Sequence, residues 1–159
     1  MAVHDISEIE AALAPRTPLF GLDLGEKTIG VAVSDISRTI GSPLELIRRG
    51  KFTTDAEHLF SLMDGRKASG IVVGLPVNMD GTEGARCQSV RAFARNLERL
   101  REGLAIAFWD ERLSSAAVNR MLIDEADVTR ARRAELVDKA AAAYILQGAL
   151  DRLRVLRGR

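Results

Sequence analysis

Residues 19–35 read LFGLDLGEKTIGVAVSD, in which two short apolar runs are separated by a tight turn. Alternation with a period of two, flanked by glycine, is typical of a β-hairpin. Because side chains at i and i+2 share one face of a strand, Gly21 and Asp23 are expected on one face and Leu22 and Leu24 on the other. Small residues alternate along the second run, at Gly30, Ala32 and Ser34. We therefore expect a groove beside Asp23 that another backbone can approach closely.

The carboxylate inside this apolar hairpin has two interpretations. Burying an unpaired Asp is costly, so Asp23 could point to water from an edge strand or pair with Lys27. Alternatively, Asp23 is a functional residue that acts together with other side chains elsewhere in the chain.

Composition excludes several classes of protein. A length of 159 residues with 47% hydrophobic residues suits one domain with a substantial core. A single cysteine, Cys87, excludes an intramolecular disulfide and a cysteine-based zinc site. The two histidines, His4 and His58, lack ligand spacing, which argues against a histidine-dependent hydrolase. No apolar run is long enough for a membrane span, and acids replace the core of a signal peptide, so we expect a cytoplasmic protein with no membrane partner.

Charge is distributed unevenly along the chain. Residues 1–80 contain 8 Lys and Arg against 11 Asp and Glu, whereas residues 81–159 contain 15 against 11. Most of the excess is arginine, which binds phosphate through a two-pronged fork. An arginine-rich proteome would produce the same excess, but the distribution slightly favours contact with nucleic acid.

The pattern of elements indicates an α/β domain at residues 19–159, preceded by an N-terminal extension at residues 1–18. We expect the extension to form a short outer helix or a loose arm. Strands are predicted at 19–24, 29–33, 39–47, 69–75 and 104–109, and helices at 53–67, 83–102, from Ser114 onward, and at 134–156. Pro43 suggests an edge strand or a bulge, and Thr53 or Thr54 could cap the first of these helices. A hairpin start followed by helical crossovers predicts a mixed five-stranded sheet, with the first three strands antiparallel and 19–24, 69–75 and 104–109 parallel.

Acidic residues from three parts of the chain are expected to converge: Asp23, the pair Asp110 and Glu111, and Asp138. Asp138 is followed at i+3, i+4 and i+7 by apolar residues, which places it on the apolar face of the last helix. The alternative is an Asp near the first helical turn, favoured by the helix dipole. Asp110 and Glu111 follow a strand at the edge where open α/β sheets bind ligands. If 71–74 and 19–24 are neighbours, the strand at 104–109 lies about 10 Å from Asp23, two spacings of ~4.8 Å.

Converging carboxylates imply a metal centre, because they repel one another without cations. Oxygen ligands without His or Cys favour Mg²⁺ or Mn²⁺. Two such ions ~3.5–4 Å apart would activate a water and stabilise the leaving oxygen in phosphodiester hydrolysis.

Four blocks of sequence, in order, resemble the YqgF/RuvX family of Holliday-junction-resolvase-like pre-16S rRNA nucleases. They are GLDLG at 21–25 with GVAVSD at 30–35, VGLP at 73–76 with NMDGTEG at 78–84, DERLS at 110–114, and DKAA at 138–141 with ILQ at 145–147. The resemblance implies a ribonuclease H-like fold and maturation of the 5′ end of 16S ribosomal RNA. It also implies metal-dependent cleavage, with Asp23, Glu111 and Asp138 as catalytic residues and metal ligands.

The resemblance leaves one ligand open and suggests substrate contacts. In the related resolvases the second carboxylate ends the fourth strand, but here that strand ends in Gly74-Leu75-Pro76. The acid has therefore moved to the fifth strand, where either Glu111 or Asp110 would bind the metal. Substrate contacts are expected from Lys27, Asn78, Arg86, Arg112 and Ser114.

Three other functions remain compatible with the sequence. The first is a resolvase of branched DNA, which should be a homodimer because a four-way junction has two-fold symmetry. The second is a non-catalytic RNA-binding ribosome assembly factor, whose affinity would fall steeply with salt. The third is an actin-like ATPase, suggested by Asp23-Leu24-Gly25 and Lys27-Thr28; it is disfavoured because such enzymes need two domains.

Overall fold

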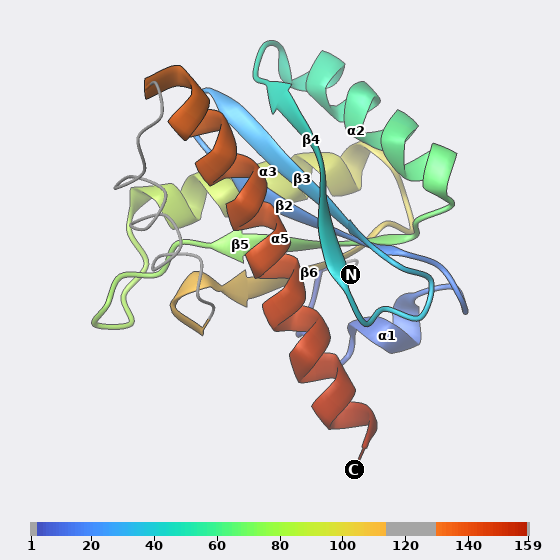
Figure 1. Cartoon of the computed structure of the whole chain (residues 1–159). Helices are drawn as coiled ribbons and strands as arrows, with labels where there is room; N and C mark the ends of the chain where they lie inside the picture. The colour runs from blue at the N-terminus through green and yellow to red at the C-terminus, as the bar shows by residue number, and fades with distance from the viewer. Residues whose placement is uncertain (1–2, 114–129, 159) are drawn as a thin grey trace.

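A six-stranded sheet with helices on both faces forms the fold (Figure 1). The computed structural model describes residues 3–113 and 130–158, and the side chains of residues 5–113 and 140–158. The strands are β1 Val3–His4, β2 Leu19–Leu24, β3 Thr28–Ser34, β4 Gly41–Arg48, β5 Gly70–Leu75 and β6 Ala105–Asp110. The helices are α1 Ile9–Ala12, α2 Phe52–Arg66, α3 Ala85–Leu100, a 3₁₀ turn η1 Glu111–Leu113, and α5 Arg130–Arg157. No helix in these ranges has the length and apolar character needed to cross a membrane.

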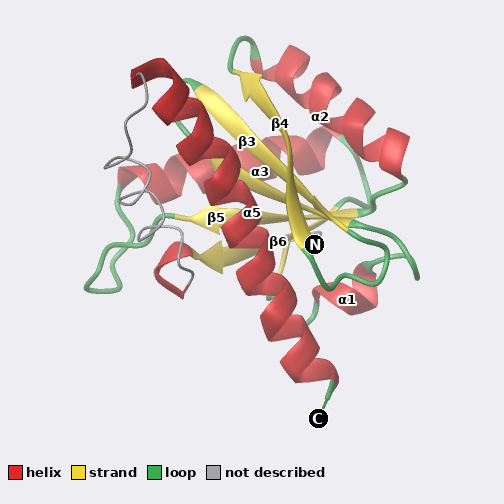
Figure 2. Ribbon diagram, in the orientation of Figure 1, coloured by secondary structure: helices red, strands yellow, loops and turns green. Residues whose placement is uncertain are grey.

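The predicted hairpin and its two faces are confirmed. β2 and β3 pair antiparallel, with Asp23 opposite Gly30. Leu22 and Leu24 belong to the core beneath α2 and α3, whereas Leu19 belongs to a second core beneath α5. Figure 2 shows the corresponding layers, with α5 crossing one side of the sheet and α2 and α3 lying on the other. Both faces are covered, which is why every residue of β2 is buried.

The predicted order of the strands is also confirmed. The sheet runs β1-β6-β5-β2-β3-β4, with β2, β5 and β6 parallel and the β2–β3–β4 meander antiparallel. β4 is an edge strand, and the pairing of β3 with β4 shifts register where Ala32 meets Pro43, as the proline suggested. The carboxyl ends of the three parallel strands share one edge of the sheet, so the residues that end them are brought together.

The alanine-rich helix α5 packs closely on the small residues of the sheet. A Cβ added to Gly21 would lie 2.7 Å from Leu146 Cβ and 3.1 Å from the Ala142 carbonyl oxygen. A Cβ on Gly41 would lie 3.1 Å from the Leu146 side chain. The close approach expected between the helix and the hairpin is therefore present, and it depends on glycine at these positions.

The N-terminal segment is attached to the sheet. Besides the expected short helix α1, Val3–His4 pairs parallel with β6 as a sixth strand, which the sequence analysis did not predict because two residues carry no periodicity. Ile9 and Leu13 are buried in the core beneath α5. Arg38 donates to the carbonyls of Ala14 and Thr17 at 2.6 and 2.8 Å, which ties the end of this segment to the loop after β3.

The start of α2 differs from the prediction. Lys51 is the N-cap residue and makes no side-chain capping bond, so the cap predicted at Thr53 or Thr54 is wrong. Asp55 instead turns back, and its carboxylate accepts hydrogen bonds of 3.1 and 3.2 Å from the Gly50 backbone N–H. The helix therefore begins before both threonines, and Asp55 stabilises the connection from β4.

Candidate active site

Asp23 is buried at the carboxyl end of β2, with only 6% of its surface exposed. It shares its face with Gly21, which contacts α5, so Asp23 lies on the α5 side of the sheet. Leu22 pairs with Val73 in the parallel register of β2 and β5. Continuing this register by one residue places Asp23 beside Gly74. Asp23 is thus in a central strand, which excludes the interpretation of an edge-strand residue pointing to water.

Glu111 reaches the same place from the next strand. It opens the 3₁₀ turn that follows β6, and Gly74 pairs with Trp109 across β5 and β6. A Cβ on Gly74 would lie 3.3 Å from Glu111 Cγ and would clash with the Ile145 side chain of α5. The Glu111 side chain therefore folds back over β5 on the α5 side. Asp23 and Glu111 both border Gly74, and the Ile145 side chain of α5 occupies the position that a Cβ on Gly74 would take.

Asp138 lies within α5, but its side chain is outside the described residues. Ala142 and Ile145, four and seven positions further along the helix, are fully buried against the sheet. Convergence of the third carboxylate therefore stays a prediction. Ser114 also lies outside the described residues.

Asp110 points to the opposite face of the sheet from Asp23. It alternates with Trp109, which packs beneath α5, and shares its side with Phe108, which packs toward α3. Its carboxylate accepts bonds from Arg112 Nη2 at 2.7 Å, Arg112 Nε at 3.1 Å and the Arg112 backbone N–H at 2.9 Å. These hydrogen bonds lower the pKa of Asp110 and raise the pKa of Arg112. The geometry therefore favours Glu111 over Asp110 as the second metal ligand.

Arg112 also reaches the loop between β5 and α3. Its Nη1 is 3.4 Å from the Met79 carbonyl oxygen. Within that loop the Asn78 amide donates to the Thr82 hydroxyl at 3.0 Å, and the Gly81 N–H donates to the Asn78 carbonyl at 2.9 Å. Gly81 has a φ of +89°, a conformation that glycine adopts without strain. Asn78 and Arg112 thus hold the shape of this loop, leaving Met79 88% exposed at its tip.

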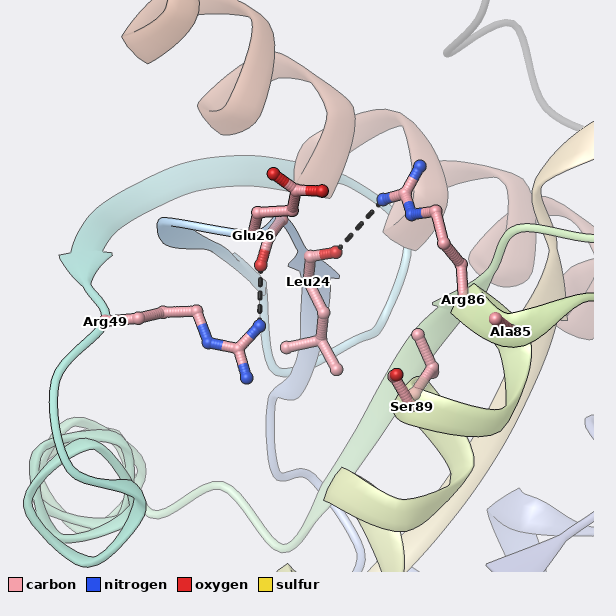
Figure 3. Close-up of a pocket in the computed structure, with 8 residues that line it drawn as sticks. Leu24, Glu26, Arg49, Ala85, Arg86 and Ser89 are labelled. Carbon is pink, nitrogen blue, oxygen red and sulfur yellow. Dashed lines mark hydrogen bonds between the residues drawn. The ribbon is translucent and has the colours of Figure 1, made fainter.

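A pocket of about 210 Å³ lies where the β2–β3 turn meets the start of α3 (Figure 3). Arg86, predicted to contact substrate, lines it and is 3.4 Å from the Leu24 carbonyl oxygen. Arg49 lines it from the other side and donates to the Gly25 carbonyl at 2.6 Å. Lys27 is exposed at the same turn. Arg49 was not among the predicted substrate contacts, although an Arg48-Arg49 pair directly after the predicted strand at 39–47 is a pattern that suits phosphate binding.

The side chains around Gly74 suit a hard divalent cation. The donors are carboxylate oxygens from Asp23 and Glu111, the ligand type that Mg²⁺ and Mn²⁺ prefer. Among the side chains described, no group of three or more His, Cys, Asp or Glu could hold a metal, so a third protein ligand would have to come from outside them.

Comparisons with known proteins identify the family of the chain. A sequence model of the family RuvX, described as Holliday junction resolvase, matches residues 17–152. A protein of Phenylobacterium zucineum named "Putative pre-16S rRNA nuclease" is 72% identical over 156 residues, 98% of this chain and 100% of the relative. A protein of the same name from Caulobacter vibrioides is 64% identical over 156 residues, again 98% of this chain and 100% of the relative.

Solved structures resemble the fold. Thermus thermophilus RuvC in complex with a Holliday junction substrate aligns with a TM-score of 0.52 and 11% identity, covering 86% of this chain and 96% of that chain. The yeast mitochondrial Holliday junction resolvase also gives a TM-score of 0.52, with 12% identity, covering 96% of this chain and 87% of that chain. These likenesses confirm the expected ribonuclease H-like fold.

Proposed function

Since this chain belongs to the RuvX family, we propose that it is a divalent-metal-dependent nuclease that hydrolyses phosphodiester bonds. The proposal is supported by two observations at the carboxyl edge of the sheet: Asp23 is buried near the end of β2, and the Glu111 side chain packs against Gly74 of the neighbouring strand β5. The substrate proposed is precursor 16S ribosomal RNA, cut near its 5′ end in the cytoplasm. The names of the two relatives above support this choice.

The roles of the residues follow from how they are held. Asp23 is fixed by a central strand and buried, so its carboxylate is preorganised on the α5 side of the edge. Glu111 is set by the short η1 turn, and Asp138 is the third expected ligand. Two Mg²⁺ or Mn²⁺ ions bound there would activate the attacking water and stabilise the leaving oxygen.

The test compares Asp23→Asn with Asp64→Asn in purified protein. Asp64 is an exposed carboxylate in α2 paired with Arg101. Asp64→Asn is therefore a matched control, because it also removes one negative charge but in a different part of the molecule. With Mg²⁺ or Mn²⁺ and a precursor 16S fragment, Asp23→Asn should slow cleavage by at least about 100-fold, or roughly 2.7 kcal/mol of barrier. Asp64→Asn should cleave as the wild type does. Equal cleavage by wild type and Asp23→Asn would refute the proposed site.

Substrate choice is tested in the same assay with a four-way DNA junction. Preferential cleavage of the junction would favour the resolvase alternative, which requires a homodimer to cut symmetrically. Binding of the RNA without turnover in either metal would favour the assembly-factor alternative. Metal-dependent cleavage of the RNA that is lost in Asp23→Asn would support the proposal.

A further inference from the structure

We propose that Arg49 and Arg86 bind a phosphate of the nucleic-acid backbone in the pocket beside the β2–β3 turn. The inference rests on the proposed function, because it assigns a subsite to the same substrate. The pocket lies next to the carboxylates but separate from them: Leu24 lines it, and Leu24 directly follows Asp23. The two residues point to opposite faces of β2, so the pocket is on the α3 side and Asp23 on the α5 side.

The pocket is assembled from three elements that are distant in sequence. Gly25 and Glu26 come from the β2–β3 turn, Arg49 follows β4, and Arg86 and Ser89 lie in the first two turns of α3. Figure 3 shows the Arg49 and Arg86 side chains reaching the end of β2 from opposite sides, with the Ser89 hydroxyl below Arg86. Two guanidinium groups and a hydroxyl supply hydrogen-bond donors that suit a phosphate.

Most donors of the two arginines make no hydrogen bond to residues 5–113 or 140–158. A guanidinium has five N–H groups. Within the described part of the chain, Arg49 uses one for the Gly25 carbonyl and lies 5.6 Å from the Phe93 ring, while Arg86 makes one long bond to the Leu24 carbonyl. These contacts orient the side chains without neutralising their charge, since carbonyls and rings are not anions. The arginines are thus positioned for an anionic ligand.

The surroundings also favour an anion. α3 begins at Ala85 with no side-chain cap on Gly84 and no acidic residue in its first turn, so its positive dipole end faces the pocket uncompensated by those groups. Glu26 is the one carboxylate among the lining residues, and it opposes anion binding. Removing its charge should therefore strengthen binding, the reverse of what removing an arginine should do.

The position of the pocket relative to Asp23 favours a nucleic acid over a small anion as its ligand. A chain that crosses the carboxyl edge of the sheet can place one phosphate at Asp23 and Glu111 and another in the pocket. The phosphodiester backbone is common to RNA and DNA, so the pocket would position either substrate without reading its sequence.

The experiment measures binding in the Asp23→Asn background without metal, so that cleavage does not interfere. Affinities for a fluorescent precursor 16S fragment and for a four-way DNA junction are measured from low to high salt. Arg49→Gln and Arg86→Gln are compared with Arg66→Gln. Arg66 is an exposed arginine 14 positions beyond Phe52 in α2, about 21 Å along the helix. The Arg49, Arg86 and Arg66 side chains are all exposed, and thermal unfolding checks that each variant is folded in the Asp23→Asn background.

Arg49→Gln and Arg86→Gln should each weaken binding roughly five- to tenfold at low salt and reduce the slope of log K against log salt by about 0.7–0.9. Glu26→Gln should tighten binding, and Arg66→Gln should leave the slope unchanged. Slopes for Arg49→Gln and Arg86→Gln that equal the Arg66→Gln slope, with both nucleic acids, would overturn the inference.

Failure of the proposed function gives a different result. If the wild type does not cleave in Mg²⁺ or Mn²⁺ but the two arginine variants still lower the salt slope, the nuclease proposal falls and the phosphate pocket stands. If the wild type cleaves but the slopes do not change, only the pocket is wrong. If neither nucleic acid binds or is cleaved, both are wrong.

Discussion

Replacing Gly21 with alanine tests how the position of α5 depends on the hairpin. The added Cβ would be 2.7 Å from Leu146 Cβ and 3.1 Å from the Ala142 carbonyl oxygen. Carbon atoms pack at about 3.5–4.0 Å, so the Leu146 contact is short by about 1 Å. Neither partner can rotate away, because one atom is a Cβ and the other belongs to the helix backbone. α5 as a whole would have to move away from the sheet.

The free energy of unfolding should fall by about 1–2 kcal/mol. Overpacking of a core costs about 1–3 kcal/mol, and the reduced entropy of the unfolded chain with alanine offsets about 0.4–1 kcal/mol. For a chain of this length, the Tm should fall by about 2–8 °C. Urea unfolding followed by circular dichroism would give the free energy, with an unchanged m-value as the sign that the effect is on the native state. Cleavage should also slow, since α5 carries Asp138.

Gly65→Ala is the matched control. Gly65 is exposed near the end of α2, and a Cβ there would have nothing within 4 Å. The same substitution should raise the free energy of unfolding by about 0.4–1 kcal/mol, because alanine favours the helix and restricts the unfolded chain. If Gly21→Ala were as stable as the wild type, the close packing of α5 on Gly21 would be refuted.

Two further predictions concern ionisable groups. Arg112 lowers the pKa of Asp110, so this pair should stabilise the protein above the ordinary carboxyl pKa of about 3.9, with the contribution lost as the pH falls through the lower folded value. Arg112→Gln should therefore lower the Tm at pH 7, and its Tm should fall less on acidification than the Tm of the wild type. Curves of Tm against pH that run parallel for the two proteins would contradict this. Cys87 is fully buried, and burial raises the pKa of its thiol. We expect a thiol reagent to label it slowly in the native protein and fully in urea, and rapid native labelling would show that the site opens.

The strands and their faces could be predicted from the sequence because they follow from local periodicity. Alternation around Gly21 and Asp23 indicates which residues share a face, and the small residues of the hairpin together with the alanines of α5 indicate a close contact. Both expectations agree with the structure. Short elements could not be predicted in this way. Val3–His4 has no measurable period, because it has two residues, and its pairing depends on the edge that β6 offers in the folded sheet.

The sequence by itself determined that carboxylates lie at the ends of two parallel strands of one mixed sheet, since the order of strands and helices constrains the topology. Only the tertiary structure decided which of two adjacent acids lies on the same face of the sheet as Asp23. Asp110 and Glu111 are one residue apart, but Asp110 continues the alternation of β6 onto the α3 side, where Arg112 binds it. Glu111 begins the η1 turn, which carries its side chain back over Gly74. A turn of three residues has no period of its own, so the direction of Glu111 depends on the space left by a glycine in a neighbouring strand.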